Sequence, residues 1–166
     1  MSPYRGIMTG RNFSADRMPW TDIFGNRRRR IPSGASRRVF VAVSIAAQDV
    51  AGYYTLTATS IALSSFSPEI VKKLPRYPVV PAVLLGRLAV ARHYQGQGLG
   101  GILLADALRR TSRAEFGVFA MVVDAKDEAA QRFYEHHGFT LLAGEARRLC
   151  LPIAAAQKVS LKKSIR

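Results

Sequence analysis

The stretch from Arg92 to Gly101, RHYQGQGLGG, decides how this chain is interpreted. It lies between an apolar run that predicts a strand over residues 83–90 (VLLGRLAV) and a helix-like run that begins at Leu99. Four of its last six residues are glycine, which tolerates positive φ and lets a ligand approach the backbone. A glycine-rich turn that opens a helix points unpaired N–H groups, backed by the helix dipole, at one spot. The stretch therefore predicts a phosphate-binding loop.

Two common phosphate loops do not fit these residues. No Lys-Ser or Lys-Thr follows the glycines, which excludes a Walker A loop. A dinucleotide-binding fingerprint needs an acidic residue at the end of the next strand. Glu115 falls inside the predicted helix and Asp124 lies further along, so that fingerprint fits poorly. The pattern that remains is Q-x-x-G-x-G over Gln95–Gly100, with an ordinary glycine-rich turn as the alternative.

A second block, residues 124–139 (DAKDEAAQRFYEHHGF), predicts a short capped helix. Asp127 is expected to be its N-cap, with Glu128 in the first turn. Gly138 is expected to end the helix as its C′ residue. Helical spacing places one set of side chains on a single face: Ala130, Phe133, Tyr134 and His137.

Together these two blocks resemble the GNAT acyltransferases. Gln95–Gly100 is similar to their acetyl-CoA pyrophosphate loop, and F-Y-x-x-x-G-F at residues 133–139 is similar to their C-terminal signature. Tyr53–Leu56 (YYTL) and Leu85–Val90 (LGRLAV) further resemble the GNAT toxins of bacterial type II toxin–antitoxin systems, which acetylate aminoacyl-tRNA. The resemblance covers about residues 38–152. It departs at Ala91, where the toxins usually carry Asp, and over residues 1–38.

The resemblance implies an α/β protein of the GNAT fold, with a mixed central sheet of about six or seven strands, a splayed acetyl-CoA-binding strand and flanking helices. It implies Tyr134 as the catalytic acid that protonates the departing thiolate of CoA. It also implies a set of acetyl-CoA-binding residues: Leu88, Ala89, Val90, Gln95, Gly96, Gln97, Gly98, Leu99, Gly100, Gly101, Asp127 and Phe133. A homodimer and a small ribbon-helix-helix antitoxin are the implied partners.

The pattern along the chain predicts a single domain in the order β-β-α-β-α-β-α-β-β. The expected strands cover residues 39–46, 50–63, 83–90, 117–124, 139–143 and 147–153, and the expected helices cover residues 68–74, 98–115 and 127–137. Residues 75–81, with three prolines, predict an extended connection. The only cysteine, Cys150, is expected to be a buried strand residue of a protein in a reducing, cytoplasmic compartment. No apolar run is long enough to predict a membrane span.

Charge is concentrated at the two ends of a chain whose net charge is +14. Residues 1–38 hold nine arginines and two aspartates, and residues 39–143 are close to neutral. We therefore expect a basic, atypical segment over residues 1–38, a catalytic domain over residues 39–153 and a basic tail over residues 154–166. Solvated, disordered ends are the alternative. The candidate contacts to tRNA phosphates are Arg27, Arg28, Arg29, Arg30, Arg87, Arg92, Lys162 and Lys163.

The predicted site has no obvious general base, and this bears on which amine can be the acceptor. A phenol such as Tyr134 is protonated at neutral pH, although a core role is the alternative. The strand at residues 83–90 carries no Asp or Glu, and Asp124 and Glu128 are left as bases acting through water. An α-amino group, with its lower pKa, needs less help than a lysine does. This favours aminoacyl-tRNA as the acceptor. Another GNAT acceptor, a protein or small-molecule amine, and a non-catalytic nucleic-acid-binding protein are the alternatives.

A catalytic histidine is the alternative to these carboxylates, with His93, His136 and His137 as the candidates. His136 and His137 are adjacent and point to different faces, so they do not form a metal-ligand pair. His93 is more typical of a structural or solvated residue than of a base. No metal site is predicted.

Overall fold

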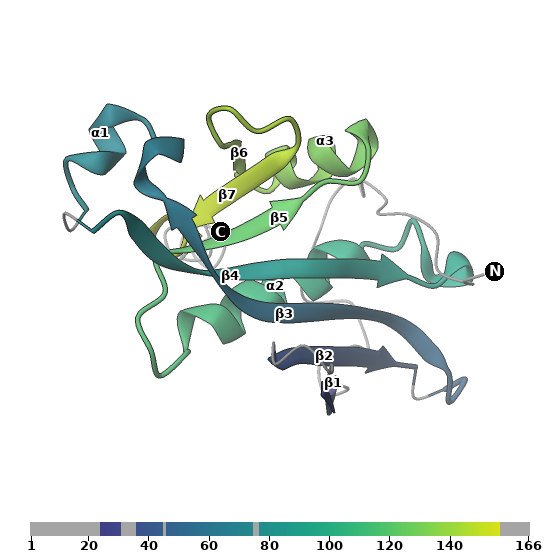
Figure 1. The fold of residues 1–166 in the computed structure, drawn as a ribbon. Helices are drawn as coiled ribbons and strands as arrows, with labels where there is room; N and C mark the ends of the chain where they lie inside the picture. Colours follow the sequence, from purple (N-terminus) through teal and green to yellow (C-terminus); the bar gives the residue numbers. More distant parts are fainter. Residues whose placement is uncertain (1–23, 31–35, 45, 75–76, 157–166) are drawn as a thin grey trace, which may run out of the picture. The chain divides into compact units, whose positions relative to one another are not determined.

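The structure of the protein, a computed structural model, describes residues 24–30, 36–44, 46–74 and 77–156 (Figure 1). Its strands are β1 Phe24–Arg30, β2 Ser36–Val43, β3 Val50–Ala62, β4 Val79–Val90, β5 Ala120–Asp124, β6 Thr140–Leu141 and β7 Arg148–Pro152. Its helices are α1 Pro68–Val71, α2 Leu99–Ser112 and α3 Glu128–His136, with 3-10 turns η2 Leu63–Ser65 and η3 Arg92–Tyr94.

The strands of the described residues form one seven-stranded sheet in the order β1-β2-β3-β4-β5-β7-β6. The pairs β1/β2, β2/β3, β5/β7 and β6/β7 are antiparallel. Figure 1 shows β4 and β5 running in the same direction, which makes the sheet mixed. The predicted fold class, an α/β protein with a mixed sheet of six or seven strands and flanking helices, is confirmed.

The strands that differ most from the sequence prediction are β1, β2 and β4, while β5, β6 and β7 are shorter than the predicted strands. The sequence predicted no strand at β1, because an arginine run has no apolar alternation, yet its backbone pairs with β2 in a register that places Arg28 opposite Arg38. As a result β2 begins at Ser36 and ends at Val43, three residues earlier than expected at each end. The strand β4 begins at Val79 and includes Pro81, whose carbonyl accepts a hydrogen bond from the Phe119 N–H at 2.9 Å. A proline lacks only the donor, so its carbonyl can still pair in a ladder.

The described residues divide into two compact units. Unit 1 contains those up to Thr57 together with Leu85–Ala107, and unit 2 contains Ala58–Leu84 together with those from Leu108 onward. In unit 1 the Phe40 ring on β2 stacks on Tyr54 of β3, with ring centroids 4.9 Å apart. The Tyr54 hydroxyl donates a hydrogen bond to the Asp106 carboxylate on α2 at 2.5 Å, and both residues are buried. This hydrogen bond connects α2 to β3.

Unit 2 has an apolar cluster of its own. Its buried members are Ile61, Phe66, Val80, Ala82, Ala120, Val122, Leu142 and Cys150. Phe66 and Phe119 meet edge to face, with ring centroids 5.6 Å apart. The prediction that Cys150 is a buried strand residue is confirmed, and burial raises the pKa of its thiol.

Gly52 on β3 is predicted to be essential to the packing of unit 1. A Cβ at this position would lie 2.8 Å from the carbonyl oxygen of Ala89 and 3.0 Å from Cδ1 of Leu103. Backbone cannot move aside cheaply, so Gly52→Ala should destabilise the protein by about 2 kcal/mol and lower Tm by roughly 4–8 °C. Calorimetry measures this shift. Gly117→Ala is the matched control, because a Cβ at Gly117 meets nothing within 4 Å. Equal Tm values for the two variants would show that β3 and β4 do not need this close approach.

Candidate functional site

The glycine loop lies in unit 1 between β4 and α2. After β4 the chain makes the 3-10 turn η3, continues through Gln95–Gly98, and enters α2 at Leu99. Gly96 and Gly98 have φ angles of 77° and 80°, which lie in the left-handed region that favours glycine. Such a backbone bends sharply at the start of a helix, where several N–H groups have no intrahelical acceptor. This backbone conformation is the one that the predicted phosphate site needs.

A small hollow follows this loop. It is lined by Val90, Tyr94, Gln95, Gly96, Gly98, Leu99 and Gly100, all of unit 1. Five of these seven residues belong to the predicted set of acetyl-CoA-binding residues from Gln95 onward, and Val90 belongs to its β4 part. Tyr94 is the one that the sequence analysis did not predict.

Two glutamine side chains fix the shape of the loop. Gln95 donates from Nε2 to the carbonyl oxygen of Val90 at 3.0 Å, which connects the loop to the end of β4. Gln97 donates from Nε2 to the carbonyl oxygen of His93 at 3.2 Å. Both amides therefore bind backbone carbonyls that precede the glycines, and both bonds restrict the conformation of the loop.

The other predicted residues of unit 1 are on β4 and η3. Leu88 and Val90 are buried, and Ala89 is half-buried with its carbonyl directed at Gly52. Arg87 and Arg92 are exposed, as required of contacts to a polyanion. The arginines of the run 27–30 lie on β1, and their side chains are not described; Lys162 and Lys163 lie outside the described residues.

Helix α3 in unit 2 begins and ends where the sequence predicted. The Asp127 side chain accepts a hydrogen bond from the Ala130 N–H at 2.8 Å, which confirms Asp127 as the N-cap. Gly138 follows the helix with a φ of 91°, as expected of a C′ glycine. The apolar face buries Ala130, Phe133 and Tyr134. His137, predicted on the same face, donates from Nδ1–H to the Phe133 carbonyl oxygen, 2.8 Å away.

Tyr134 is enclosed by aromatic rings. Its ring centroid lies 5.2 Å from that of Phe133 and 5.5 Å from that of Phe139, and only 3% of the residue is exposed. Burial raises the pKa of the Tyr134 phenol well above its ordinary value. The hydroxyl therefore stays protonated at neutral pH. It has a proton to donate to a departing thiolate held against it and cannot accept one, although the raised pKa also makes it a weaker acid than a free phenol.

Asp124 and Glu128, the carboxylates that the sequence offered as bases acting through water, each form an ion pair with an arginine. Arg148 donates to the two carboxylate oxygens of Asp124 at 2.7 and 3.0 Å, and this pairing raises the pKa of Arg148. Glu128 pairs with Arg132 one turn along α3. Both ion pairs are exposed to solvent, and each places a guanidinium directly against the carboxylate. These contacts weaken the case for either group as a general base.

Within the part of the chain that the structure describes, no group of three or more His, Cys, Asp or Glu side chains is arranged to hold a metal ion. Among the same residues, no helix is long and apolar enough to span a membrane.

Comparison with known proteins places this geometry in context. Residues 35–141 match the family described as Acetyltransferase (GNAT) domain. The chain is 36% identical over 104 residues to a tRNA-acetylating toxin of Mycobacterium tuberculosis (strain ATCC 25618 / H37Rv), and the match covers 61% of each protein. The chain therefore spans about three fifths of the length of this curated relative.

Two solved structures are also similar. One is AtaT complexed with acetyl-methionyl-tRNAfMet, with a TM-score of 0.67 and 32% identity, covering 76% of this chain and 75% of that one. The other is a mutant AtaT toxin bound to the C-terminus of the antitoxin AtaR and acetyl-CoA. It has a TM-score of 0.59 and 29% identity, covering 74% of this chain and 71% of that one.

The N-cap of α3 is predicted to make stability depend on acid pH. The Ala130 N–H lowers the pKa of Asp127, and Lys126 and Arg147 lower it further, against a smaller opposing effect of burial. A lowered pKa in the folded state means that the ionised carboxylate stabilises the fold above the unfolded pKa of about 3.9, and that this contribution is lost as pH falls through the folded value. Asp127→Asn keeps an oxygen acceptor without the charge. Thermal unfolding from pH 7 to pH 2.5 should show the wild type more stable at neutral pH and the two proteins converging below about pH 4. A difference that does not change with pH would contradict this account.

Proposed function

The chain belongs to the GNAT acetyltransferase family, and on that premise we propose that it transfers an acetyl group from acetyl-CoA to the α-amino group of an aminoacyl-tRNA, blocking translation as a toxin. The observation that carries the proposal is the loop at Gln95–Gly98, where two positive-φ glycines open α2. This is the backbone that a pyrophosphate requires. The similarity to a tRNA-acetylating toxin and to AtaT with acetyl-methionyl-tRNAfMet supports the choice of acceptor.

The proposed reaction needs an amine, a thioester and one proton donor. The loop binds the pyrophosphate of acetyl-CoA, and the backbone of β4 at Leu88–Val90 binds the amide arm. The neutral amine attacks the thioester carbonyl, and the C–N bond forms. The tetrahedral intermediate then collapses, the C–S bond breaks, and the thiolate takes the proton of the Tyr134 hydroxyl. Tyr134 is reprotonated by the proton that the amine loses, through solvent.

The choice of an α-amino group follows from the residues that could act as a base. Asp124 and Glu128 are paired with arginines, and β4 carries no carboxylate. A free lysine, with a pKa near 10.4, would arrive almost entirely protonated, whereas an α-amino group near 7.7–8.0 is partly neutral at physiological pH. Esterification of the adjacent carboxyl group lowers the pKa of that amine further. An acceptor of this kind needs little help from the enzyme.

The finer features of the proposal are its partners and its location. We infer a homodimer that works in the cytoplasm and is neutralised by a small ribbon-helix-helix antitoxin. A net charge of +14 favours an acidic or amphipathic tail from such a partner, and the structure of mutant AtaT with the C-terminus of AtaR supports that mode of inhibition. The exposed Arg87 and Arg92, the arginines of the run 27–30 and the lysines 162 and 163 are the proposed contacts to tRNA phosphates.

The role of Tyr134 predicts a variant that binds but does not react. Tyr134→Phe keeps the ring that packs against Phe133 and Phe139 and removes only the hydroxyl. Acetyl-CoA binding and Tm should stay close to wild type, while turnover should fall by about 10²–10⁴-fold. Stopped-flow transfer assays beside calorimetric binding measure both quantities. Turnover within twofold of wild type would assign Tyr134 to the core alone.

If aminoacyl-tRNA is the acceptor, it should be the molecule that carries the new acetyl group. After incubation with acetyl-CoA and charged tRNA, nuclease digestion and mass spectrometry should find acetylated aminoacyl-adenosine. Deacylated tRNA should bind without reacting, because it has no amine. Binding should weaken steeply as salt rises, with a slope set by the number of phosphates contacted. Transfer to free lysine or a small polyamine with charged tRNA untouched would replace this proposal with a general amine acetyltransferase. No transfer to any amine, with tRNA still bound, would favour a non-catalytic nucleic-acid-binding protein.

A further inference from the structure

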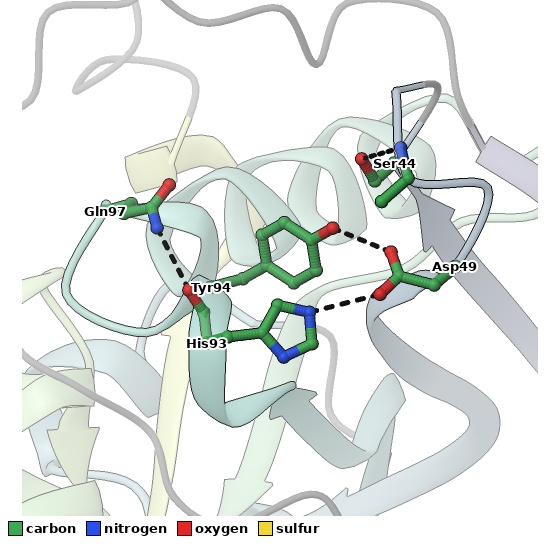
Figure 2. Close-up of polar contacts among 6 residues, drawn as sticks. Ser44, Asp49, His93, Tyr94 and Gln97 are labelled. Atoms are coloured by element: carbon green, nitrogen blue, oxygen red, sulfur yellow. Dashed lines mark hydrogen bonds and ion pairs between the residues drawn. The ribbon is translucent and has the colours of Figure 1, made fainter.

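One carboxylate from the turn between β2 and β3 holds the segment that leads into the glycine loop. Asp49 accepts a hydrogen bond from the Tyr94 hydroxyl through Oδ1 at 2.7 Å. Its other oxygen, Oδ2, lies 3.1 Å from Nε2 of His93. Figure 2 shows the two ring side chains of η3 directed at the single carboxylate. All three residues belong to unit 1, and Asp49 is more than 40 residues away from the loop in sequence.

The turn that presents Asp49 is itself fixed by short hydrogen bonds. The Ser44 N–H donates to the Asp49 carbonyl oxygen at 2.8 Å, and the Gln48 N–H donates to the Ser44 carbonyl oxygen at 2.8 Å. The Ser44 hydroxyl oxygen accepts from the Ala47 N–H at 3.2 Å (Figure 2). Gln48 has a φ of 56°, a left-handed conformation that places Asp49 at the base of the turn. The carboxylate is therefore presented by a well-closed turn.

The same contacts continue from η3 into the ligand loop. Gln97 donates to the carbonyl of His93, so the residue held by Asp49 in turn holds the glycine loop (Figure 2). Tyr94 lines the hollow beside Gln95, Gly96 and Gly98. The end of β4 is fastened separately, because the Ala91 N–H donates to the Ala51 carbonyl oxygen at 2.8 Å. Asp49 is thus connected to the glycine loop through a single intervening turn, η3.

The carboxylate is ionised when it makes these contacts. The hydrogen bond from Tyr94 lowers the pKa of Asp49, as do the hydrogen bond and charge of His93, against a smaller opposing effect of burial. Hydrogen bonds to an ionised acceptor are stronger than those between neutral groups. Asp49 and His93 are exposed at 42% and 64% of their side chains, so solvent screens this pair and the more enclosed Tyr94 contact is the stronger of the two.

We propose that Asp49 is a positioning residue for acetyl-CoA: through Tyr94 and His93 it holds the glycine loop in its binding conformation before the ligand arrives. The inference rests on the proposed function in assigning acetyl-CoA to that loop. A flexible glycine-rich loop loses conformational entropy when it closes on a ligand, and holding it in advance removes part of that loss. Asp49 touches neither the acetyl group nor the acceptor amine in this proposal. It acts on affinity and not on the chemical step.

The first test separates affinity from turnover. Asp49→Ala should raise the Kd and KM for acetyl-CoA about fivefold to tenfold, the size expected for losing the acceptor of one charged hydrogen bond at a partly exposed site. The kcat at saturating acetyl-CoA should change by less than about twofold. The matched control is Glu69→Ala, which removes an exposed carboxylate whose hydrogen-bond donor among the described residues is the nearby Ser67 hydroxyl at 3.3 Å, and should leave Kd unchanged. An unchanged Kd for Asp49→Ala, or a fall in kcat with Kd unchanged, would overturn the proposal.

A double-mutant cycle tests the path through Tyr94. Tyr94→Phe removes the hydroxyl and keeps the ring, so it should raise Kd by a factor close to that of Asp49→Ala. The double variant should bind little more weakly than Tyr94→Phe alone, because Tyr94→Phe already removes the hydrogen bond to Asp49 as well as the contact of the hydroxyl with Ser44. His93→Gln retains a side-chain Nε2 donor and should change Kd by less than about twofold. Effects of Asp49→Ala and Tyr94→Phe that multiply in the double variant would contradict the shared path.

Hydrogen exchange of the free protein tests positioning without any ligand. In Asp49→Ala the amides of residues 92–98 should exchange faster than in wild type, with those of β7 and α3 unchanged. Faster exchange throughout the protein, or unchanged exchange in the loop, would overturn the positioning role. Failure of wild type to bind acetyl-CoA would overturn the proposed function instead, and this exchange measurement would still decide whether Asp49 holds the loop.

Discussion

The hydrogen bond between Tyr54 and Asp106 is the constraint on which unit 1 depends. A carboxylate that is 7% exposed, in the middle of an apolar helix face, is costly to bury unless a donor meets it, and the Tyr54 hydroxyl does so at 2.5 Å. Tyr54 is held in turn by the stacked ring of Phe40. Rotating or sliding α2 would break this contact, so the helix has one position on β3. The first turn of α2 carries the N–H groups of the glycine loop, and their direction is therefore set two turns away from any ligand.

The two chemical roles of the proposed reaction belong to different compact units. Unit 1 provides polar backbone: the loop at Gln95–Gly98, tied to β4 by the Gln95 side chain and to the β2–β3 turn by Asp49. Unit 2 provides a hydroxyl in an apolar setting, Tyr134 between Phe133 and Phe139. These environments are opposite for a physical reason. A phosphate group is bound by exposed N–H donors, which a glycine-rich backbone can present. A phenol that donates a proton must be neutral before it reacts, and burial favours the neutral form by raising the pKa of Tyr134.

Local chemistry explains which features were predictable from the sequence. The sharp glycine turn between β4 and α2, the Asp127 cap, the Gly138 C′ position and the buried Cys150 strand each follow from a few neighbouring residues, and each was confirmed as local structure. The features that were missed depend on partners distant in sequence. Nothing near Asp49 or Tyr54 indicates that they meet η3 and α2. The strand β1 was missed because backbone pairing needs no apolar pattern, and the pairing of Asp124 with Arg148 was missed because it joins two strands.

Pairing of the acidic side chains also bears on how such an enzyme selects its acceptor. A base that accepts a proton from lysine must be free and must face the amine, and the two carboxylates considered for that task are held by Arg148 and Arg132. An enzyme without such a base acts only on amines that are already partly neutral at the ambient pH, because the ammonium form has no lone pair with which to attack the thioester. A low pKa of the substrate amine then supplies the neutral nucleophile that other enzymes obtain with a general base. In the proposed reaction aminoacyl esters meet that requirement, and the exposed Arg87 and Arg92, which precede the glycine loop in sequence, suit the attached polyanion. The pKa of the amine and the charge of the phosphates then act as two independent determinants of the proposed specificity.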